Sequence, residues 1–246
     1  MHRLEALECE YPQFFDPNSP TQRVGSDLAQ GGFEQAEHRS PMLSLGNTYS
    51  EGEVREWYGR VSKGLGREDV EVVCELKFDG TSISLWYEKG ELVRAVTRGD
   101  GKRGDDVTRN VRTIRNVPLK LGIRYLLLDS DIVEFRGEIL LPWKEFERLN
   151  VEREREGETL FANPRNAASG TLKLQNSRTV AKRNLIAQVY NVQITDNREQ
   201  SVANEVTLNL NTHYGALQWA KQLGLPVSDT TKVYKSIDEV MEFIAY

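Results

Sequence analysis

The feature that most constrains the fold is the spacing of apolar residues after position 70. Three short runs rich in β-branched and aromatic residues lie close together, at residues 70–76, 83–87 and 92–96. Asp79-Gly80 separates the first two runs, and Lys89-Gly90 separates the last two. Short apolar runs divided by glycine-containing turns are typical of antiparallel strands joined by tight connections. The pattern therefore predicts an antiparallel meander over residues 70–98.

Helices and further strands are expected on both sides of this meander. Ser50 and Glu53 have the spacing of a capping box, which predicts a helix start. The apolar residues that follow recur at helical spacing, so this helix should lie on a core. They are Val54, Trp57, Tyr58, Val61 and Leu65. Strands are expected at residues 132–141 and 184–194, and helices from about Pro142, over residues 212–223 and from Ser236. The fold class is α+β, dominated by antiparallel sheet.

Composition excludes several classes of protein. With 246 residues, 39% of them hydrophobic, the chain is long enough to bury a core as one large domain or two small ones. Its formal charge of −5 gives no overall basic field, so contact with nucleic acid would depend on a local group of Lys and Arg side chains. No apolar run approaches the roughly 18 residues that span a bilayer, so a membrane is not an expected partner.

Cysteine and histidine usage argues against a structural zinc site, a site built from histidines and a disulfide framework. Cys9 and Cys74 lie far apart without CxxC spacing, which disfavours structural zinc and makes a reducing cytoplasm the expected location. The three histidines are His2, His38 and His213, and none stands at metal-ligand spacing from another.

A candidate reactive lysine lies where the first predicted strand runs out into a turn. The tetrapeptide is Lys77-Phe78-Asp79-Gly80, and Glu75 precedes Lys77 by two residues, which would place both on one face of a strand. A Lys-x-Asp-Gly match is weak by itself, because an Asp-Gly hairpin turn beside a solvated lysine has the same sequence. Taken alone, the tetrapeptide favours that simpler interpretation.

Other stretches along the chain change this balance. They are Thr97-Arg98-Gly99-Asp100-Gly101, Glu134-Phe135-Arg136-Gly137-Glu138-Ile139, and residues 161–173 with the sequence FANPRNAASGTLK. Together with residues 19–21 and 38–47 (HRSPMLSLGN), they resemble the adenylation domain of NAD-dependent DNA ligases, and the likeness covers essentially the whole chain. ATP-dependent ligases and capping enzymes share the Lys-x-Asp-Gly element but not the block at 161–173, and they are the first alternative. A non-catalytic nucleotide-binding module is the second.

The resemblance implies a fold, an activity and a domain arrangement. The fold would be an antiparallel-sheet nucleotidyltransferase core with flanking helices. Lys77 would attack the α-phosphate of NAD, release NMN and carry AMP, which would then pass to the 5′-phosphate of a nick in double-stranded DNA. Residues 1–45 would be an extended N-terminal arm and the connection from a missing NMN-binding domain. Residues 46–246 would be the adenylation domain, ending before its last two lysine motifs.

The resemblance also assigns residues to the adenosine half of NAD. Glu75 resembles the carboxylate that reads the exocyclic amine of adenine, since a carboxylate only accepts hydrogen bonds. Tyr190 resembles the aromatic residue that stacks on the base, and an ordinary core aromatic is the alternative. Ser44 and Leu45 match positions that line the nucleotide pocket. Without the resemblance, they would be interpreted as loop packing.

Further residues would act on the ribose and phosphates. Arg98 is expected there because a planar guanidinium can hold two oxygens at once, and a surface arginine is the alternative. Glu138 would contact the ribose or help to hold a metal, and an ion pair with Arg136 is the alternative. Arg165 would contact phosphate near a helix start. Lys173 stands where better-known members have an arginine, so it would meet a DNA or nucleotide phosphate without bidentate geometry.

Catalysis places further demands on the site. An amine attacks phosphorus only when neutral, so Lys77 would need burial or neighbouring cations, which Arg98 and Arg165 could supply. Mg²⁺ is the metal that the resemblance implies; Asp79 is the nearest candidate ligand, unless it serves only the turn. Zinc is expected only in the missing C-terminal part. The resemblance implies that two lysines and the leaving-group side are missing, so the isolated chain is expected to adenylylate itself weakly or not at all. It is also expected to be a monomer.

Overall fold

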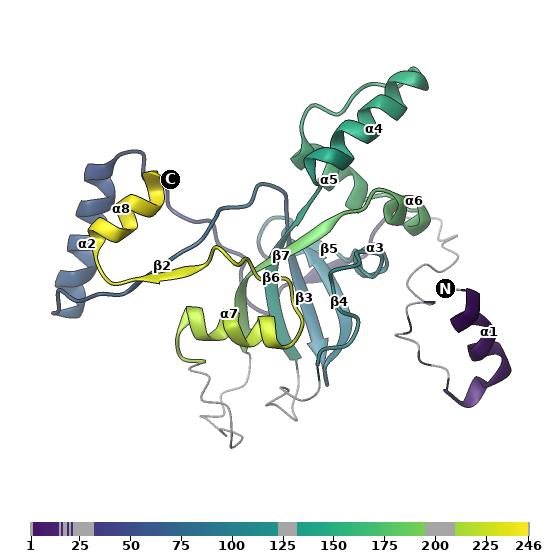
Figure 1. The fold of residues 1–246 in the computed structure, drawn as a ribbon, viewed down its shortest axis with the longest axis horizontal. Coiled ribbons are helices and arrows are strands. Elements are labelled where there is room, and N and C mark those ends of the chain that lie inside the picture. The colour runs from purple at the N-terminus through teal and green to yellow at the C-terminus, as the bar shows by residue number, and fades with distance from the viewer. Residues whose placement is uncertain are drawn as a thin grey trace.

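A four-stranded antiparallel sheet forms the centre of the computed structural model, which describes residues 2–14, 16, 19, 21, 32–122, 132–194 and 210–245 (Figure 1). Its strands are β3 (Thr81–Glu88), β4 (Glu91–Thr97), β6 (Ile132–Leu140) and β7 (Ile186–Ile194), in the spatial order β4-β3-β6-β7. All three neighbouring pairs are antiparallel. The α+β class and the strands expected at residues 132–141 and 184–194 are confirmed.

The hairpin between β3 and β4 has the turn that the sequence indicates. Lys89 and Gly90 occupy its central positions with φ of 50° and 79°, the left-handed conformations that match the twist of two-residue hairpins. The first strand of the predicted meander pairs elsewhere. It forms β2 (Val72–Cys74), which pairs with β8 (Lys232–Tyr234). The three-stranded meander is therefore wrong, because residues 75–79 form no regular structure and β3 begins only after Gly80.

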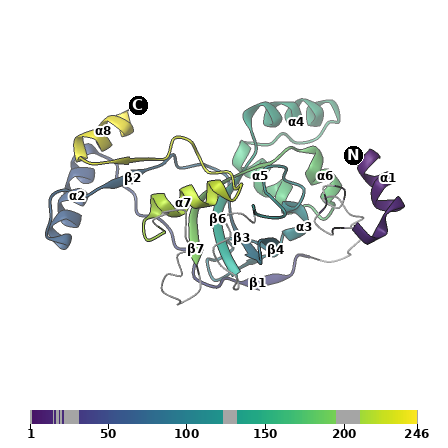
Figure 2. The ribbon, with the colours of Figure 1, turned by 60° about the horizontal axis from the view of Figure 1, so that its bottom comes forward.

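A small body of two helices and two strands lies to one side of the sheet. It contains α2 (Glu51–Leu65), α8 (Ile237–Ala245), β2 and β8 (Figure 1, Figure 2). The predicted helix start is confirmed, since Ser50 Oγ accepts a hydrogen bond from Glu53 N at 3.3 Å. The expectation that α2 lies on a core is wrong, because none of its side chains is buried and Trp57 is 39% exposed. So few short elements provide too little apolar surface to cover this helix.

The remaining described elements lie outside the four-stranded sheet. They are α1 (His2–Glu10), the 3₁₀ helix η1 (Pro12–Phe14), β1 (Gln35–Glu37), β5 (Arg103–Asp105), α3 (Thr108–Val111), α4 (Trp143–Arg155), α5 (Pro164–Leu172), α6 (Ser177–Lys182) and α7 (His213–Gln222). The helices expected from about Pro142, over residues 212–223 and from Ser236 are confirmed as α4, α7 and α8. Among the described residues, no helix combines the length and apolar character needed to cross a membrane.

The N-terminal prediction of an extended arm is wrong for residues 2–10, which form α1. Leu, Ala and Glu make up most of this stretch, and their helix propensity outweighs the lack of a long apolar pattern. Further along, β1 pairs antiparallel with β5 and so places residues 35–37 beside the sheet. Residues 22–31 of the expected arm lie outside the described residues.

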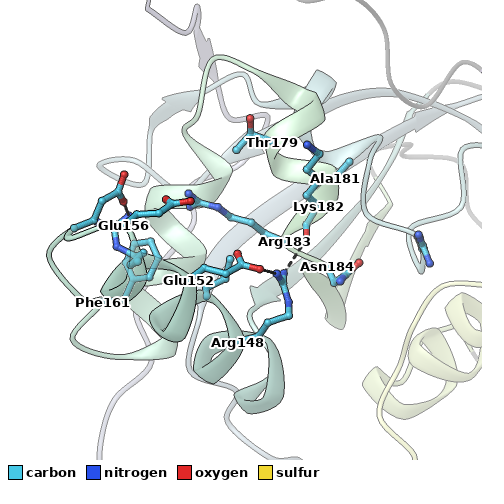
Figure 3. Close-up of a pocket in the computed structure, with 13 residues that line it drawn as sticks. Arg148, Glu152, Glu156, Phe161, Thr179, Ala181, Lys182, Arg183 and Asn184 are labelled. Carbon is cyan, nitrogen blue, oxygen red and sulfur yellow. Dashed lines mark hydrogen bonds and ion pairs between the residues drawn. The ribbon is translucent and has the colours of Figure 1, made fainter.

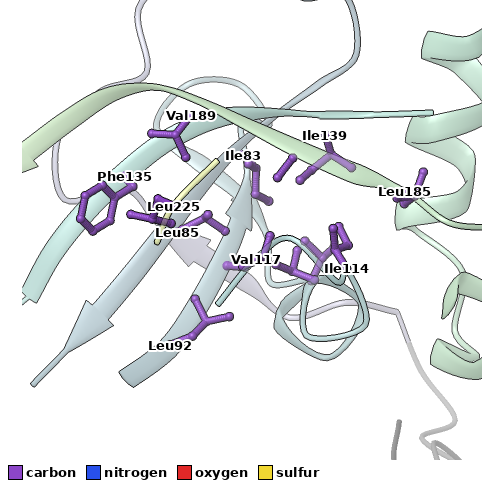
Figure 4. Packing of buried hydrophobic residues seen from close by; sticks show 14 of the residues in the cluster. Ile83, Leu85, Leu92, Ile114, Val117, Phe135, Ile139, Leu185, Val189 and Leu225 are labelled. Carbon is purple, nitrogen blue, oxygen red and sulfur yellow. The ribbon is translucent and has the colours of Figure 1, made fainter. Parts of the chain in front are cut away.

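One face of the four-stranded sheet packs into the main hydrophobic core. Ile83, Leu85 and Phe135 are fully buried there, and Figure 4 shows these side chains gathered on one side of the strands. The ring of Phe135 lies 5.6 Å from that of Tyr87 and 6.0 Å from that of Trp219 in α7. Helices α3, α5, α6 and α7 all contribute apolar side chains to this core. Their packing fixes the sheet as a rigid platform.

The opposite face of the same strands is polar. Successive side chains of a strand point to opposite faces, so the residues between the core positions of β3 and β6 lie together on the second face. They are Ser82, Ser84 and Trp86 of β3, and Glu134, Arg136 and Glu138 of β6, which pair in the order Ser82↔Glu138, Ser84↔Arg136 and Trp86↔Glu134. This surface is the polar face of the sheet. It contains the residues whose chemistry is available for function.

Candidate functional site on the polar face

Glu138 is the most completely enclosed carboxylate among the predicted site residues. It is 8% exposed. Its Oε1 accepts a hydrogen bond from Gly80 N at 3.2 Å, and its Oε2 accepts one from Ser82 Oγ at 3.0 Å. Burial raises the pKa of Glu138, against the opposing effects of these hydrogen bonds and of nearby Lys77 and Arg165. Arg136 pairs with Glu134 instead, so the alternative ion pair between Glu138 and Arg136 is wrong.

Tyr190 lies on the polar face rather than in the core. In the pairing of β6 with β7, Arg136 is opposite Asn191 and Gly137 is opposite Val189, so Tyr190 is the unopposed residue of a β-bulge. Bulges commonly re-aim a side chain. Burial raises the pKa of the Tyr190 phenol, and the charge of Glu138 raises it further. The alternative of an ordinary core aromatic is therefore wrong, and Tyr190 is brought next to Glu138.

Lys77 lies in the irregular segment before Gly80, and its side chain is exposed. Burial therefore does not favour a neutral Lys77 amine, because residues 75–79 lie outside the regular sheet. A cation does lie nearby. Arg165 forms an ion pair of 2.6 Å with Asp79, two residues after Lys77. Lys77, Asp79 and Arg165 thus gather at the edge of the polar face where Glu138 is buried.

Glu75 is placed differently from the strand geometry that the sequence indicates. The period of two does not apply to residues 75–79, because they form no strand. The Glu75 carboxylate lies 3.2 Å from Nε2 of His213, at the first position of α7. The sequence predicts no site role for His213. Its pairing with Glu75 spans 138 residues, so no local pattern could indicate it.

The segment between β1 and α2 brings Ser44 to Arg98. Arg98 Nη2 donates a hydrogen bond to Ser44 Oγ at 2.8 Å. Upstream, His38 Nε2 lies 3.1 Å from the carbonyl oxygen of Arg98, and Met42 N donates to the carbonyl oxygen of Gly101 at 2.9 Å. Arg98 is therefore more than an isolated surface side chain. Leu45 is 80% exposed.

Helix α5 separates the other two predicted phosphate contacts. Asn163 caps its start, with Oδ1 accepting from Asn166 N at 2.8 Å, and Pro164 is its first residue. Arg165 lies in the first turn, whereas Lys173 follows the last and forms an ion pair of 2.7 Å with Asp105. Eight residues of helix rise about 12 Å. The structure thus does not bring Arg165 and Lys173 together, and a single phosphate group is too small to contact both side chains.

A cavity of about 820 Å³ lies elsewhere, between α4 and α6 (Figure 3). Its walls carry charges of both signs, including Arg148, which bonds to Glu152 at 2.6 Å, and Arg153, which bonds to Glu158 at 2.7 Å. Among the described residues, none of the predicted nucleotide-binding residues lines it. No group of three or more His, Cys, Asp or Glu side chains in the described parts of the chain could hold a metal ion.

The arrangement on the polar face defines a class of site. A buried carboxylate, a half-buried phenol and hydroxyl groups lie beside exposed cations, which suits a ligand with an aromatic part, hydroxyl groups and phosphate. The description of the family model that matches residues 30–246 is NAD-dependent DNA ligase adenylation domain. A second model, DNA ligase-like, N-terminal NAD+-binding domain, matches residues 1–25. The chain therefore belongs to the family of NAD-dependent DNA ligase adenylation domains.

Curated relatives agree with this assignment. A DNA ligase of Parabacteroides distasonis is 53% identical over 100% of this chain and 35% of its own length. A DNA ligase of Phocaeicola vulgatus is 54% identical over the same shares, and one of Thermotoga petrophila is 46% identical over 99% of this chain and 33% of its own length. The chain thus spans about a third of the length of these relatives.

Proposed function

We propose that this chain carries out the adenylylation step of an NAD-dependent DNA ligase. The Nζ atom of Lys77 attacks the α-phosphorus of NAD after losing a proton, an N–P bond forms, and the P–O bond to NMN breaks. The AMP then passes from Lys77 to the 5′-phosphate of a nick in double-stranded DNA, before the phosphodiester bond is made. The carrying observation is that Lys77, Arg165 and the buried Glu138 gather at one edge of the polar face in a chain of this family.

The adenosine half of NAD would be bound by the polar face. Tyr190 would stack on the base, which its place in a bulge beside Glu138 supports. Glu138 would accept a hydrogen bond from a ribose hydroxyl, and its enclosure favours such a fixed acceptor. Glu75 would accept from the adenine amine. Ser44 and Leu45 would cover the adenosine from the segment above the sheet, which the bond from Arg98 to Ser44 supports.

The phosphates would be bound at the edge of the face. Arg165 would contact the α-phosphate near Lys77, and Arg98 a neighbouring phosphate or ribose oxygen. Lys173, at the far end of α5, would then contact DNA phosphate rather than the same nucleotide phosphate. Residues 1–45 would connect this domain to an NMN-binding domain.

Mg²⁺ would fit this site only as a partly hydrated ion. The described residues offer no cage of three acidic or imidazole ligands, but Asp79 is 70% exposed at its side chain and lies beside Lys77 in the sequence. One carboxylate together with phosphate oxygens and water is a usual Mg²⁺ environment. When bound there, the ion would offset negative charge on the transferred phosphate. Asp79 would have to exchange its bond to Arg165 for the ion.

The test is intact mass spectrometry of the chain after incubation with Mg²⁺ and either NAD or ATP, followed by peptide mapping. Even a weak AMP adduct on Lys77, formed with NAD and absent in Lys77→Ala, would support the chemistry. Lys144→Ala, which changes an exposed lysine of α4, should keep the adduct. A slow or absent adduct, with thermal protection by AMP, would fit a pocket that binds adenosine but needs the rest of the ligase for the reaction.

Other outcomes separate the alternatives. An adduct with ATP but not with NAD would support an ATP-dependent nucleotidyltransferase. An adduct on another lysine would overturn the role of Lys77. Neither an adduct nor protection by AMP, with the chain folded, would overturn the proposed function. Binding of AMP that is unchanged in Lys77→Ala, with no adduct under any condition even in a full-length ligase carrying this domain, would support a non-catalytic module.

A further inference from the structure

A buried ion pair on the polar face has no role in the function proposed above. Glu134 is fully buried and Arg136 is 9% exposed. Arg136 Nε donates to Glu134 Oε1 at 2.7 Å, and the same oxygen accepts from Ser84 Oγ at 2.8 Å. Ser84 Oγ in turn accepts from Trp86 Nε1 at 2.7 Å. A chain of three hydrogen-bonded side chains across β3 and β6, those of Trp86, Ser84 and Glu134, therefore fixes the direction of the Arg136 guanidinium.

The rest of that guanidinium binds a segment outside the sheet. Arg136 Nη1 donates to the carbonyl oxygen of Pro41 at 3.0 Å. Arg136 Nη2 donates to the carbonyl oxygen of Ser40 at 2.7 Å and to Ser40 Oγ at 2.6 Å. A planar guanidinium can make such bonds at once, whereas a lysine ammonium cannot reproduce the same fork. Arg136 thus joins the segment around Ser40 to the polar face.

This segment leads directly to predicted nucleotide-binding residues. Met42, two residues before Ser44, is 5% exposed, so its side chain anchors the segment at that point. Beyond it the side chains are open, with Leu43 at 84% and Leu45 at 80% exposure. The position of Ser44 and Leu45 over the sheet is therefore determined largely by the bonds that precede them. The Arg98 bond to Ser44 is the contact made from the other side.

The energetics favour positioning over stability as the role of this pair. Removing two charges from water is costly, and an apolar pair of similar volume is often as stable or more so. Glu134 Oε2 is also buried without a hydrogen-bond partner among the described residues, which adds to that cost. The ion pair instead directs the N–H donors of Arg136 toward residues 40–41, which an apolar pair could not do.

We propose that Arg136 is a positioning residue that holds residues 38–45 over the polar face and so sets the affinity for the adenosine half of NAD. This inference rests on the proposed function. Arg136 acts through Ser40 and Pro41 and does not itself contact the nucleotide. Glu134 acts one step further away, by orienting Arg136.

The test compares Arg136→Lys with a matched control, Arg148→Lys. Arg148 also donates to two carboxylates and a backbone carbonyl, but it lies on α4, away from residues 38–45. AMP affinity is measured by calorimetry, and amide exchange is followed by mass spectrometry. We expect Arg136→Lys to weaken AMP binding about ten-fold and to speed exchange in residues 38–45 while β3 and β6 stay protected. Arg148→Lys should change neither.

Each outcome separates this inference from the proposed function. If the wild-type chain does not bind AMP, the proposed function fails. If the wild type binds AMP and Arg136→Lys binds it equally well, the positioning role is overturned and the proposed function stands. If Arg136→Lys also loses protection in β6, Ser40→Ala decides, because it removes one bond without disturbing the sheet. Weaker AMP binding in Ser40→Ala supports the proposal, and unchanged binding rejects it.

Discussion

Replacement of Gly80 by alanine tests why the Lys-x-Asp-Gly tetrapeptide ends in glycine. A Cβ at position 80 would overlap the carbonyl oxygen of Ile139 in β6 and would lie 2.7 Å from Leu140 Cδ2. The φ angle of Gly80 is not in the left-handed region, so space rather than backbone conformation requires glycine. Its amide also donates to Glu138. The substitution therefore pushes β3 away from β6 at the point where Glu138 receives that bond.

Two costs determine the expected magnitude. Apolar carbons pack best at about 3.5–4.0 Å, so the chain must move by about 1 Å, and such overpacking costs about 1–3 kcal/mol. If the movement also breaks the Gly80 bond, a buried carboxylate oxygen loses its donor, which costs about 1–3 kcal/mol more. The sum is about 2–6 kcal/mol, a large share of the about 5–15 kcal/mol that stabilises a typical domain.

Urea denaturation of Gly80→Ala and Gly170→Ala measures this difference. Gly170 lies on the exposed side of α5, and a Cβ there would meet no atom within 4 Å. Alanine at a helical position of this kind should stabilise by about 0.5–1 kcal/mol. Opposite signs for the two variants are therefore expected. A Gly80→Ala variant within about 0.5 kcal/mol of the wild type would refute the close approach of Gly80 and Ile139, since the overlap alone is expected to cost more.

Two further substitutions probe the site and the outlying body. Because burial raises the pKa of Glu138, the folded state binds the Glu138 proton more tightly than the unfolded state does. The contribution of Glu138 to stability is therefore present below the ordinary pKa of a glutamate and is lost as the pH rises through the raised pKa of the folded state. Urea unfolding across this range should show Glu138→Gln gaining stability relative to the wild type as pH rises, and a constant difference would contradict the burial. Ser50→Ala removes the cap of α2 and should destabilise that helix by about 1 kcal/mol. Faster amide exchange in the first turn of α2, with no change in β6, would be the measured sign.

Local patterns were sufficient to predict most elements of the main sheet. The Lys89-Gly90 turn, the capping residue Ser50 and the strand at residues 132–141 depend on neighbours in the chain, and each is present in the structure. The pairing of β2 with β8 could not be predicted in this way. Its residues Val73 and Val233 are 160 positions apart in the sequence, and three-residue strands carry too little pattern to indicate a partner.

In the candidate site, too, local patterns are visible in the sequence but long-range contacts are not. The polar alternation of Glu134, Arg136 and Glu138 is visible in the sequence, and so is the eight-residue spacing that places Arg165 and Lys173 at opposite ends of one helix. The sequence does not show which side chain each of these charged residues contacts. That Glu75 meets His213, and that Lys173 meets Asp105, follows only from how distant segments pack. Most residue roles assigned from the sequence depended on family resemblance for this reason.

One face of β6 packs into the apolar core and the other carries charged side chains. The same strand therefore contributes both to the rigid core and to the candidate site. Phe135 and Ile139 contribute their full apolar area to the core, so truncating them should cost stability whatever the ligand. Glu134, Arg136 and Glu138 are nearly as buried but bring charge to the opposite face. Burial of charge without ligand contact is costly. The strand therefore stays ordered because its apolar face offsets the cost of the polar one, and this allows charged groups to be held in fixed positions where the nucleotide is proposed to bind.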